Sequence, residues 1–258
     1  MNLRLLFTTL LAAVAGAAHA QQAAKPEDTE VWEPIPKVVT PGNSTSAAPS
    51  DAVVLFDGKN LDHWVSTENH NEPARWTVAD GVLTVKKDAG NIETKRSFGN
   101  YQLHLEWRVP ANISGTGQAR GNSGVFLASL GKGDLGYELQ ILDAYQNKTY
   151  VNGMAGSIYK QIIPLANPAR KPGEWQTYDV VWTAPTFTSG GAMATPARAT
   201  VFFNGVLVQN NVALSGPTVY IGKPAYQQAH GPAPIKLQAH GDKSEPLSFR
   251  NIWVRELP

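Results

Sequence analysis

The feature that most constrains this chain is an alternation of apolar and polar residues with a period of two. It is clearest over residues 101–109, where Tyr, Leu, Leu, Trp and Val occupy the odd positions and Gln, His, Glu and Arg the even ones. Successive side chains of a β-strand point to opposite faces, so this pattern predicts a strand with one buried and one polar face. Residues 137–141 and 235–240 repeat the alternation over shorter lengths.

Short turns separate the other strands that the sequence predicts. Asp80-Gly81 and Asn204-Gly205 are two-residue hairpin signals, and each lies between two runs rich in apolar and β-branched residues. No stretch of helical length has a convincing apolar period of 3.6 residues. Many short strands divided by Gly and Pro are typical of an all-β protein, and we expect a two-sheet sandwich of the jelly-roll kind.

The beginning of the chain predicts export. Arg4 precedes an apolar run over residues 5–18, and Ala18-His19-Ala20 is a small-x-small cleavage site. The run is short for a bilayer span, and no second long apolar run follows it. We therefore expect residues 1–20 to be a signal peptide and the mature protein to be periplasmic or secreted.

The mature chain divides into two parts at residue 50. Residues 21–50 are rich in Pro, Ala, Ser and Thr, which predicts an extended arm. Residues 51–258 carry the strand pattern, and their length suits a single all-β domain. The chain has no Cys, so we expect its stability to come from the hydrophobic core alone.

Charge and missing motifs narrow the function. Of the 22 basic residues one, Arg4, lies in the leader, and none of the 21 acidic residues does, so the mature chain is formally neutral. A neutral chain without basic runs argues against nucleic acid and anionic membranes as partners. The chain also lacks a phosphate-binding glycine loop, a dinucleotide fingerprint and the G-x-S-x-G motif of serine hydrolases.

Three predicted strands carry chemically active side chains on their polar faces. These are His104, Glu106 and Arg108; Glu138 and Gln140; and Lys236, Gln238 and His240. A half-buried strand shows a polar face to water without any further purpose, and for the first strand the pattern leaves both interpretations open. His104 and Glu106 share a face without a third ligand at metal spacing, so we expect no metal site there.

Asp143 follows the strand of Glu138 and Gln140. A bulge at residues 141–142 would turn Asp143 to the side of Glu138, and bulges are common beside active sites. Two carboxylates on one groove floor suit acid–base chemistry, because a close pair raises one pKa and leaves an acid beside a base. In the alternative interpretation Asp143 only begins the next turn, and the pattern does not decide between the two.

Two further residues have a structural and a functional interpretation. His240 is either an ordinary strand-end residue or a proton carrier, since the pKa of imidazole is near neutrality. Asn122 lies in the turn at residues 121–124, which is either a plain turn or one that presents an amide to a ligand.

The order of short motifs over residues 51–258 resembles the 3-keto-disaccharide hydrolase domain family. The matching residues are Leu55–Leu61 with Trp64, Trp76, Asp80–Leu83, Thr94-Lys95, Leu103, Glu106–Arg108, Asn122–Val125, Tyr137–Ile141 with Asp143, Gly156–Tyr159, Gly173–Gln176, Ile235–Gly241 and Phe249–Ile252. The resemblance implies a concanavalin A-like lectin/glucanase sandwich. Glucanases of that fold carry E-x-D-x-x-E on a bulged strand, whereas this chain has Glu138-x-Gln140-x-x-Asp143, which argues against ordinary retaining hydrolysis.

The chemistry implied by the resemblance begins with a sugar oxidised to a ketone at C3. A base takes the acidic C2 hydrogen, the C1 substituent is expelled, and water adds back across the enone. This route needs a base, an enolate stabiliser and a proton donor. The resemblance implies Glu138 or His240 as base and donor, with Asp143 assisting. The implied stabilisers of the oxyanion are Arg108 and Lys160. The residues implied to hold sugar hydroxyls are Lys95, Glu106, Asn122, Gln140 and Gln238.

Two other functions suit the same fold. The first is a non-catalytic carbohydrate-binding module, which would have no use for paired acids beside a His. The second is an ordinary glycoside hydrolase, against which the changes at Gln140 and Asp143 argue. In each case we expect a small-molecule or oligosaccharide substrate. The sequence requires no cofactor, and it leaves open a divalent metal in the place of a cationic enolate stabiliser.

Overall fold

The computed structural model describes residues 24–258, which form two units. The first unit ends at Val38; its described residues are all exposed and contain one short 3-10 helix, η1 (Pro26–Thr29). The second unit, Val39–Pro258, contains all the strands that the structure describes. The predicted signal peptide, residues 1–20, lies outside the described residues.

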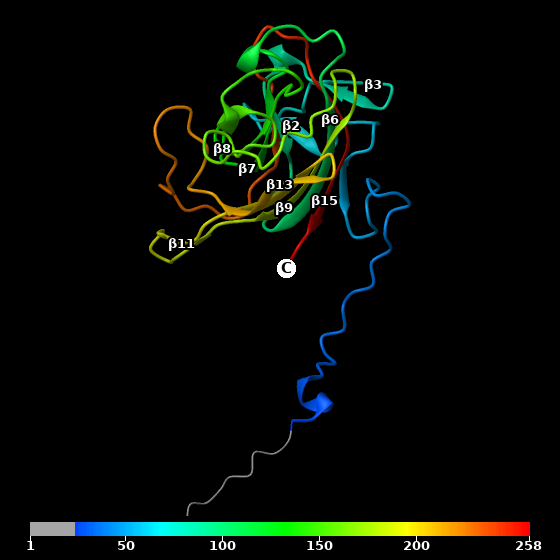
Figure 1. Ribbon diagram of the computed structural model, residues 1–258, viewed down its shortest axis with the longest axis vertical. Helices are drawn as coiled ribbons and strands as arrows, with labels where there is room; N and C mark the ends of the chain where they lie inside the picture. The colour runs from blue at the N-terminus through cyan, green and yellow to red at the C-terminus, as the bar shows by residue number, and fades with distance from the viewer. Residues whose placement is uncertain (1–23) are drawn as a thin grey trace, which may run out of the picture. The chain divides into compact units, whose positions relative to one another are not determined.

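The larger sheet has eight antiparallel strands (Figure 1). Its strands follow one another in the order β13-β12-β9-β6-β15-β4-β3, and β1 pairs with β15 beside this path. The strands are β1 (Val53–Phe56), β3 (Thr77–Ala79), β4 (Val82–Thr84), β6 (Tyr101–Arg108), β9 (Gln176–Thr183), β12 (Arg198–Phe203), β13 (Val206–Ala213) and β15 (Ser248–Glu256).

The smaller sheet has five antiparallel strands in the order β2-β5-β14-β7-β8. They are β2 (Trp64–Ser66), β5 (Ile92–Thr94), β7 (Ser123–Ser129), β8 (Gly136–Ile141) and β14 (Lys236–Leu237). A two-stranded ribbon, β10 (Thr186–Phe187) with β11 (Met193–Thr195), and the 3-10 helices η2 (Lys87–Ala89), η3 (Gly117–Ala119) and η4 (Val151–Gly153) complete the domain. The fold prediction is confirmed: the chain is an all-β, two-sheet sandwich of the jelly-roll type.

The core lies between the two sheets and follows the alternation seen in the sequence. The odd-numbered residues of 101–109 are at most 1% exposed, and so are Tyr137, Leu139 and Ile141 of β8. Two tyrosines of the larger sheet also bind the backbone of the smaller one. Tyr178 donates its hydroxyl to the carbonyl oxygen of Gln140 at 2.7 Å, and Tyr101 does the same to Leu127 at 2.5 Å. These bonds fix β7 and β8 from the core side.

The even-numbered residues of β6 lie on the other face of the larger sheet, away from the core. His104 is 1% exposed and lies between Asp179 and Glu106, and its ring stacks on Trp253 of β15. The carbonyl oxygen of Ser46 accepts hydrogen bonds from the Trp253 indole and from the side chain of Asn251. Residues 39–50, which the sequence assigns to the arm, therefore pack against β15 and cover this polar face.

Candidate active site

A pocket of about 170 Å³ opens over the outer face of the smaller sheet. Glu138 and Gln140 of β8, Gln238 and His240 just after β14, and Asn122 just before β7 all line it. These residues are far apart in the sequence, and antiparallel pairing of β14 and β8 with the same strand, β7, brings them together. The structure therefore places five of the ten predicted site residues in one pocket.

Glu138 is held on the pocket side because its neighbours in β8, Tyr137 and Leu139, are fully buried in the core. A Cβ atom at Gly124 of the adjacent strand would lie 2.5 Å from Oε1 of Glu138, so the carboxyl group occupies the space that the glycine leaves. The backbone amide of Glu138 donates to the hydroxyl oxygen of Thr218 at 3.0 Å. Glu138 is thus enclosed at the end of the pocket, with 4% of its surface exposed.

Burial raises the pKa of Glu138 to about 8, and the nearby carboxylate of Asp134 acts in the same direction. The ammonium group of Lys236 acts against them but does not overcome them. Asp134 lines the pocket as well. At neutral pH the carboxyl group of Glu138 is therefore mostly protonated, and it can donate a proton to a bound molecule.

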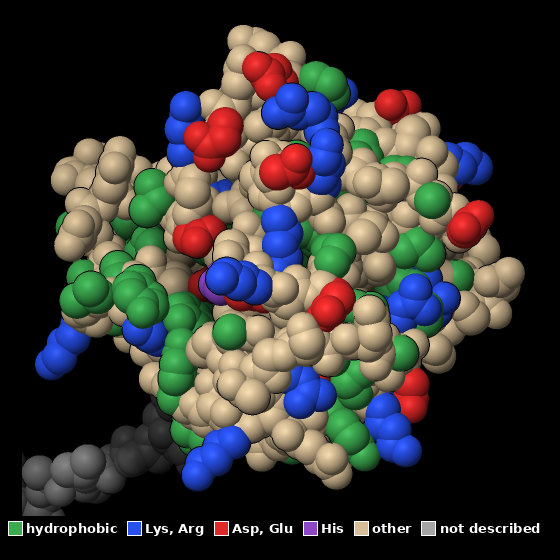
Figure 2. All heavy atoms as spheres, turned by 90° about the horizontal axis from the view of Figure 1, so that it is seen from above, with side chains coloured by type: hydrophobic (Ala, Val, Ile, Leu, Met, Phe, Trp, Pro, Cys, Tyr) green, Lys and Arg blue, Asp and Glu red, His purple; other side chains and the backbone are tan. Residues whose placement is uncertain are grey.

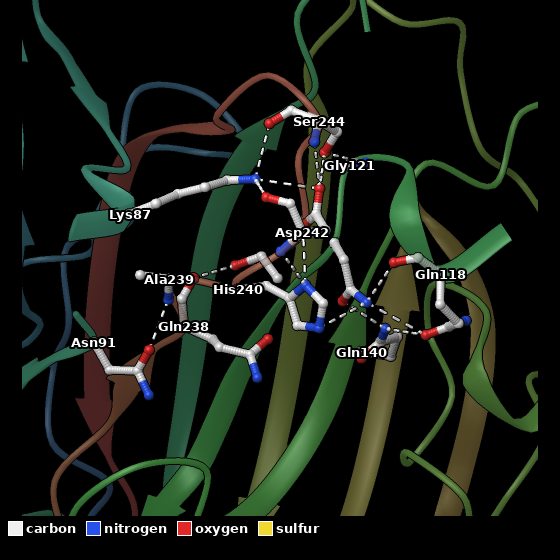
Figure 3. A network of polar contacts seen from close by, with 12 residues as sticks. Lys87, Asn91, Gln118, Gly121, Gln140, Gln238, Ala239, His240, Asp242 and Ser244 are labelled. Atoms are coloured by element: carbon white, nitrogen blue, oxygen red, sulfur yellow. Dashed lines mark hydrogen bonds and ion pairs between the residues drawn. The ribbon is translucent and has the colours of Figure 1, made fainter. Parts of the chain in front are cut away.

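His240 lines the same pocket as Glu138. Figure 3 shows the contact between its imidazole and Asp242. Nδ1 of His240 lies 2.9 Å from Oδ2 of Asp242, while Oδ1 of Asp242 accepts from the Ser244 amide at 2.7 Å and from Lys87 Nζ at 3.2 Å. Burial opposes ionisation, yet the hydrogen bonds from His240, Ser244 and Lys87 hold the pKa of Asp242 below its ordinary range. Nδ1 of His240 thus has the Asp242 carboxylate and, at 3.2 Å, the Asp242 backbone amide as neighbours. In the tautomer that carries its proton on Nδ1, the Nε2 lone pair can act as a base.

The amide side chains of the pocket form a chain of contacts beside the imidazole. Asn122 Nδ2 lies 3.4 Å from His240 Nε2 and donates to the Gln118 carbonyl at 2.9 Å, and Asn122 Oδ1 accepts from Gln140 Nε2 at 3.0 Å. The Oε1 atoms of Gln140 and Gln238 are buried without a hydrogen-bond partner in residues 24–258. Buried acceptors are nearly always paired in folded proteins, so these two oxygens suit the hydroxyl groups of a ligand.

Asp143 does not join this pocket. The β7–β8 register has no shift at residues 141–142, and β8 ends at Ile141. Oδ1 of Asp143 accepts from the Tyr145 amide at 3.0 Å, and Arg120 Nε lies 2.7 Å from Oδ2. Burial raises the pKa of Asp143, while the Tyr145 amide and Arg120 act against it. The structure thus shows the turn that the sequence offered as the alternative.

Arg108 and Glu106 lie in the other sheet, on the face that points away from the core. The Arg108 guanidinium sits 4.5 Å from the ring centroid of Trp175, and Glu106 pairs with Arg250 at 2.6 Å. The alternation of β6 identified a polar face correctly, but it carries no information about which sheet the strand joins. Neither residue lines the pocket of Glu138.

The two predicted lysines also lie outside the pocket lining. Lys95 follows β5 and is exposed. Nζ of Lys160 donates to the carbonyl oxygen of Tyr220 at 2.7 Å and lies 3.9 Å from the centroid of that ring. The same Nζ lies 5.9 Å from the ring centroids of Tyr150 and Tyr159, so Lys160 contacts the tyrosines of the wall without being a lining residue itself.

Several pocket residues were not predicted from the sequence: Asp134, Thr218 and Tyr220 lie in loops without a pattern, and Tyr159 was matched as part of a motif without a role. Asp242 is different, because a carboxylate two residues after a candidate histidine is a local signal. The spacing His240-x-Asp242 could have been used to predict that Asp242 holds the imidazole of His240.

The surface and the charged groups add three observations. Acidic and basic side chains are interspersed on the face seen in Figure 2, which gives no support to a nucleic-acid partner. Within residues 24–258, no helix has the length and hydropathy that a membrane span requires. The same part of the chain contains no group of three or more His, Asp or Glu side chains suited to a metal ion.

The sequence of this chain matches a known protein family. Residues 51–255 match the family model of the 3-keto-alpha-glucoside-1,2-lyase-like domain. The chain belongs to this family. All the pocket residues described above fall within the matched range, so the site lies in the part of the chain that defines membership.

Solved structures of similar proteins agree with this placement. A crystal structure of a candidate glycosyl hydrolase from Parabacteroides distasonis is 51% identical, with a TM-score of 0.83 over 96% of this chain and 100% of that one. Another from the same organism shares the fold at 23% identity and a TM-score of 0.54, over 80% and 99% of the two chains.

A curated relative is more distant. A 3-keto-disaccharide hydrolase of Bacteroides thetaiotaomicron is 28% identical over 83 residues, which are 29% of this chain. The match spans about a quarter, 26%, of that relative's length. It is consistent with the family membership that the longer matches establish.

Proposed function

We propose that this protein is an exported carbohydrate-active enzyme that cleaves 3-keto-glycosides by C2 deprotonation, elimination of the C1 substituent and rehydration. Membership of the 3-keto-alpha-glucoside-1,2-lyase-like family supports a carbohydrate-active enzyme. The observation that carries the chemistry is that Glu138, whose pKa burial raises to about 8, lines one pocket with His240, whose Nδ1 is held by Asp242.

In the first half of the reaction His240 Nε2 takes the proton from C2 of the 3-keto sugar. Asp242 stabilises the imidazolium that forms. The electron pair of the C–H bond passes through the enolate to a C1–C2 double bond, and the C1–O bond breaks. Glu138 gives its proton to the departing oxygen, so the leaving group departs as an alcohol.

The second half reverses the roles of the two groups. Glu138, now a carboxylate, takes a proton from a water molecule as its oxygen bonds to C1. The imidazolium of His240 returns a proton to C2, which restores both groups to their starting states. The net reaction is the addition of one water molecule and the release of one alcohol.

The amide groups of the pocket supply binding and charge stabilisation. No Lys or Arg lies among the lining residues that the structure describes, so a donor for the enolate oxygen is a neutral amide N–H group. The amide nitrogens of Asn122 and Gln140 already donate within the protein, which leaves Gln238 for this role. The unpaired Oε1 atoms of Gln140 and Gln238 accept sugar hydroxyls. Asp143, Arg108, Glu106, Lys95 and Lys160 have no direct role in this proposal.

The test compares a 3-keto-glucoside with its unoxidised parent, using the wild-type protein and Glu138→Gln. We expect turnover of the 3-keto compound alone, and a loss of about 10²–10⁴-fold in the variant, which keeps the shape but cannot cycle a proton. Turnover of the parent alone would establish an ordinary glycoside hydrolase. Binding of both compounds without turnover of either would establish a carbohydrate-binding module.

Export is a separate part of the proposal and rests on the sequence of residues 1–20. We expect the protein recovered from the periplasm or the medium to begin at Gln21. Sequencing of the N-terminus after cell fractionation checks this, and a full-length chain in the cytoplasm would contradict it.

A further inference from the structure

The pocket of Glu138 continues into a wider hollow of about 310 Å³. Asn122, Tyr159, Tyr220 and His240 line both parts, which makes them the boundary between the two. Glu138 lines the narrow part and does not line the hollow. A ligand that extends from the narrow part into the hollow therefore passes the imidazole of His240.

Three tyrosines form much of the hollow: Tyr150, Tyr159 and Tyr220. The hydroxyl groups of Tyr150 and Tyr159 lie 2.6 Å apart, and their ring centroids are separated by 6.3 Å. Tyr220 is 72% exposed, although large aromatic side chains usually bury most of their surface. Rings that remain open to solvent on the wall of a binding site suit stacking against the flat face of another ring.

The rings are held in place by their surroundings. A Cβ atom at Gly153 would collide with Cε2 of Tyr150, so only a glycine lets that ring take its position. Gln118 donates to the Gly153 carbonyl at 2.7 Å and thereby fixes the short helix η4. Lys160 holds Tyr220 through its carbonyl oxygen and through the face of its ring. A surface fixed in this way loses little conformational entropy when it binds a ligand.

We propose that this hollow is the leaving-group subsite, and that it selects leaving groups which carry a ring over small alkyl groups. The inference rests on the proposed function. The unpaired acceptors of Gln140 and Gln238 lie in the narrow part, which assigns the hydroxyl-rich 3-keto sugar to that side. The C1–O bond then lies between Glu138 and His240, and the group on C1 extends to the tyrosines.

The experiment compares two 3-keto-glucosides whose leaving groups are ethanol and cyclohexylmethanol. The two alcohols have similar acidity, so the intrinsic ease of breaking the C1–O bond is matched and the ring is the difference. We expect kcat/KM of the wild-type protein to favour the cyclohexylmethyl compound by about fivefold or more, the size of one or two ring contacts. Tyr150→Leu and Tyr220→Leu should each lower this ratio.

Two control variants separate ring stacking from general damage. Tyr220→Phe keeps the ring and should keep the ratio. Tyr145→Leu removes a tyrosine that lines neither part of the site, and it should leave the ratio unchanged. If both compounds turn over with equal kcat/KM, or if the two leucine variants in the hollow keep the wild-type ratio, the inference is overturned and the proposed function stands. If neither 3-keto compound is cleaved, the proposed function fails, and this inference fails with it.

Discussion

Two clusters in this molecule combine a histidine with carboxylates, and they lie on the outer faces of different sheets. On β6, β9 and β15, His104 is paired with Asp179 and Glu106, Glu106 is paired with Arg250, and residues 39–50 cover the group. Beside β8 and β14, His240 and Glu138 face a pocket in which the acceptors of two glutamines have no partner in the described residues. We name these the paired cluster and the pocket cluster.

The difference shows what separates a structural ion-pair network from a reactive site. Both clusters contain titratable groups whose pKa values are moved by burial and neighbours, so a shifted pKa does not distinguish them. The distinguishing feature is that the pocket cluster lines an open volume with an imidazole, a carboxyl group and two glutamine side chains whose buried acceptor oxygens have no partner in the described residues. In the paired cluster the charged groups form ion pairs with one another.

The largest expected effect contrasts the two histidines. His240→Asn should lower kcat/KM for a 3-keto-glucoside by about 10²–10⁴-fold, because it removes the proposed base. His104→Asn should leave that activity close to wild type and should lower stability instead. Steady-state kinetics and thermal unfolding of both variants check this. Equal losses of activity in two folded variants would remove the distinction between the clusters.

The second prediction concerns the pH dependence of activity. Burial, with Asp134 nearby, raises the pKa of Glu138 to about 8, and the proposed role requires the protonated form. We expect kcat/KM to fall about tenfold per pH unit above about pH 8, as the carboxyl group loses its proton. A pH profile of kcat/KM measures this limb. Activity that stays level to pH 10 would contradict the role of Glu138 as an acid.

The third prediction tests the space that Glu138 occupies. A Cβ atom at Gly124 would lie 2.5 Å from Oε1 of Glu138, so Gly124→Ala should displace the carboxyl group and destabilise the fold by about 1–3 kcal/mol. The matched control is Gly99→Ala, where a Cβ atom would have no neighbour within 4 Å. Urea unfolding and kinetics of both variants are the measurements. Equal stability and equal activity of the two variants would contradict the prediction that the Glu138 carboxyl group fills the space beside Gly124.

The smallest effect is a pH dependence of stability that belongs to the paired cluster. Burial opposes the charge on His104, but Asp179 and Glu106 raise its pKa to about 9. A raised pKa stabilises the folded state below the unfolded pKa of about 6.5, and this contribution disappears as the pH rises through about 9. We expect wild type to lose about 1–2 kcal/mol more than His104→Gln between pH 6 and pH 9.5. Urea unfolding at the two pH values checks this, and parallel losses would contradict it.

The sequence predicted the fold well because period-two alternation is a local signal. The alternation alone predicts which side chains are buried in residues 101–109 and 137–141, whichever strands these segments pair with. The site was predicted in part for the same reason: Glu138, Gln140, Gln238 and His240 share polar faces of such strands. Which sheet a strand joins is not a local property, and this is why Glu106 and Arg108 were grouped with residues on the other side of the molecule.

The remaining differences concern loops and turns. The sequence left Asp143 open between a bulge at the side of Glu138 and the next turn, because its hydrogen bond from the Tyr145 amide and its pairing with Arg120 depend on contacts that the strand pattern does not contain. Tyr150 and Tyr220 come from segments without periodicity. Their positions depend on Gly153 and Lys160, whose roles become visible only once the chain is folded.

The most direct test of the central claim follows the hydrogen at C2. A 3-keto-glucoside with deuterium at C2 should react more slowly than the unlabelled compound, and its product should carry hydrogen from the solvent at C2, with an enzyme-free sample as the control for spontaneous exchange. This result is predicted because His240 removes the C2 proton and exchanges it with water before returning it. Cleavage at an unchanged rate with the C2 label fully retained would contradict the account, since the bond at C1 would then break without deprotonation at C2.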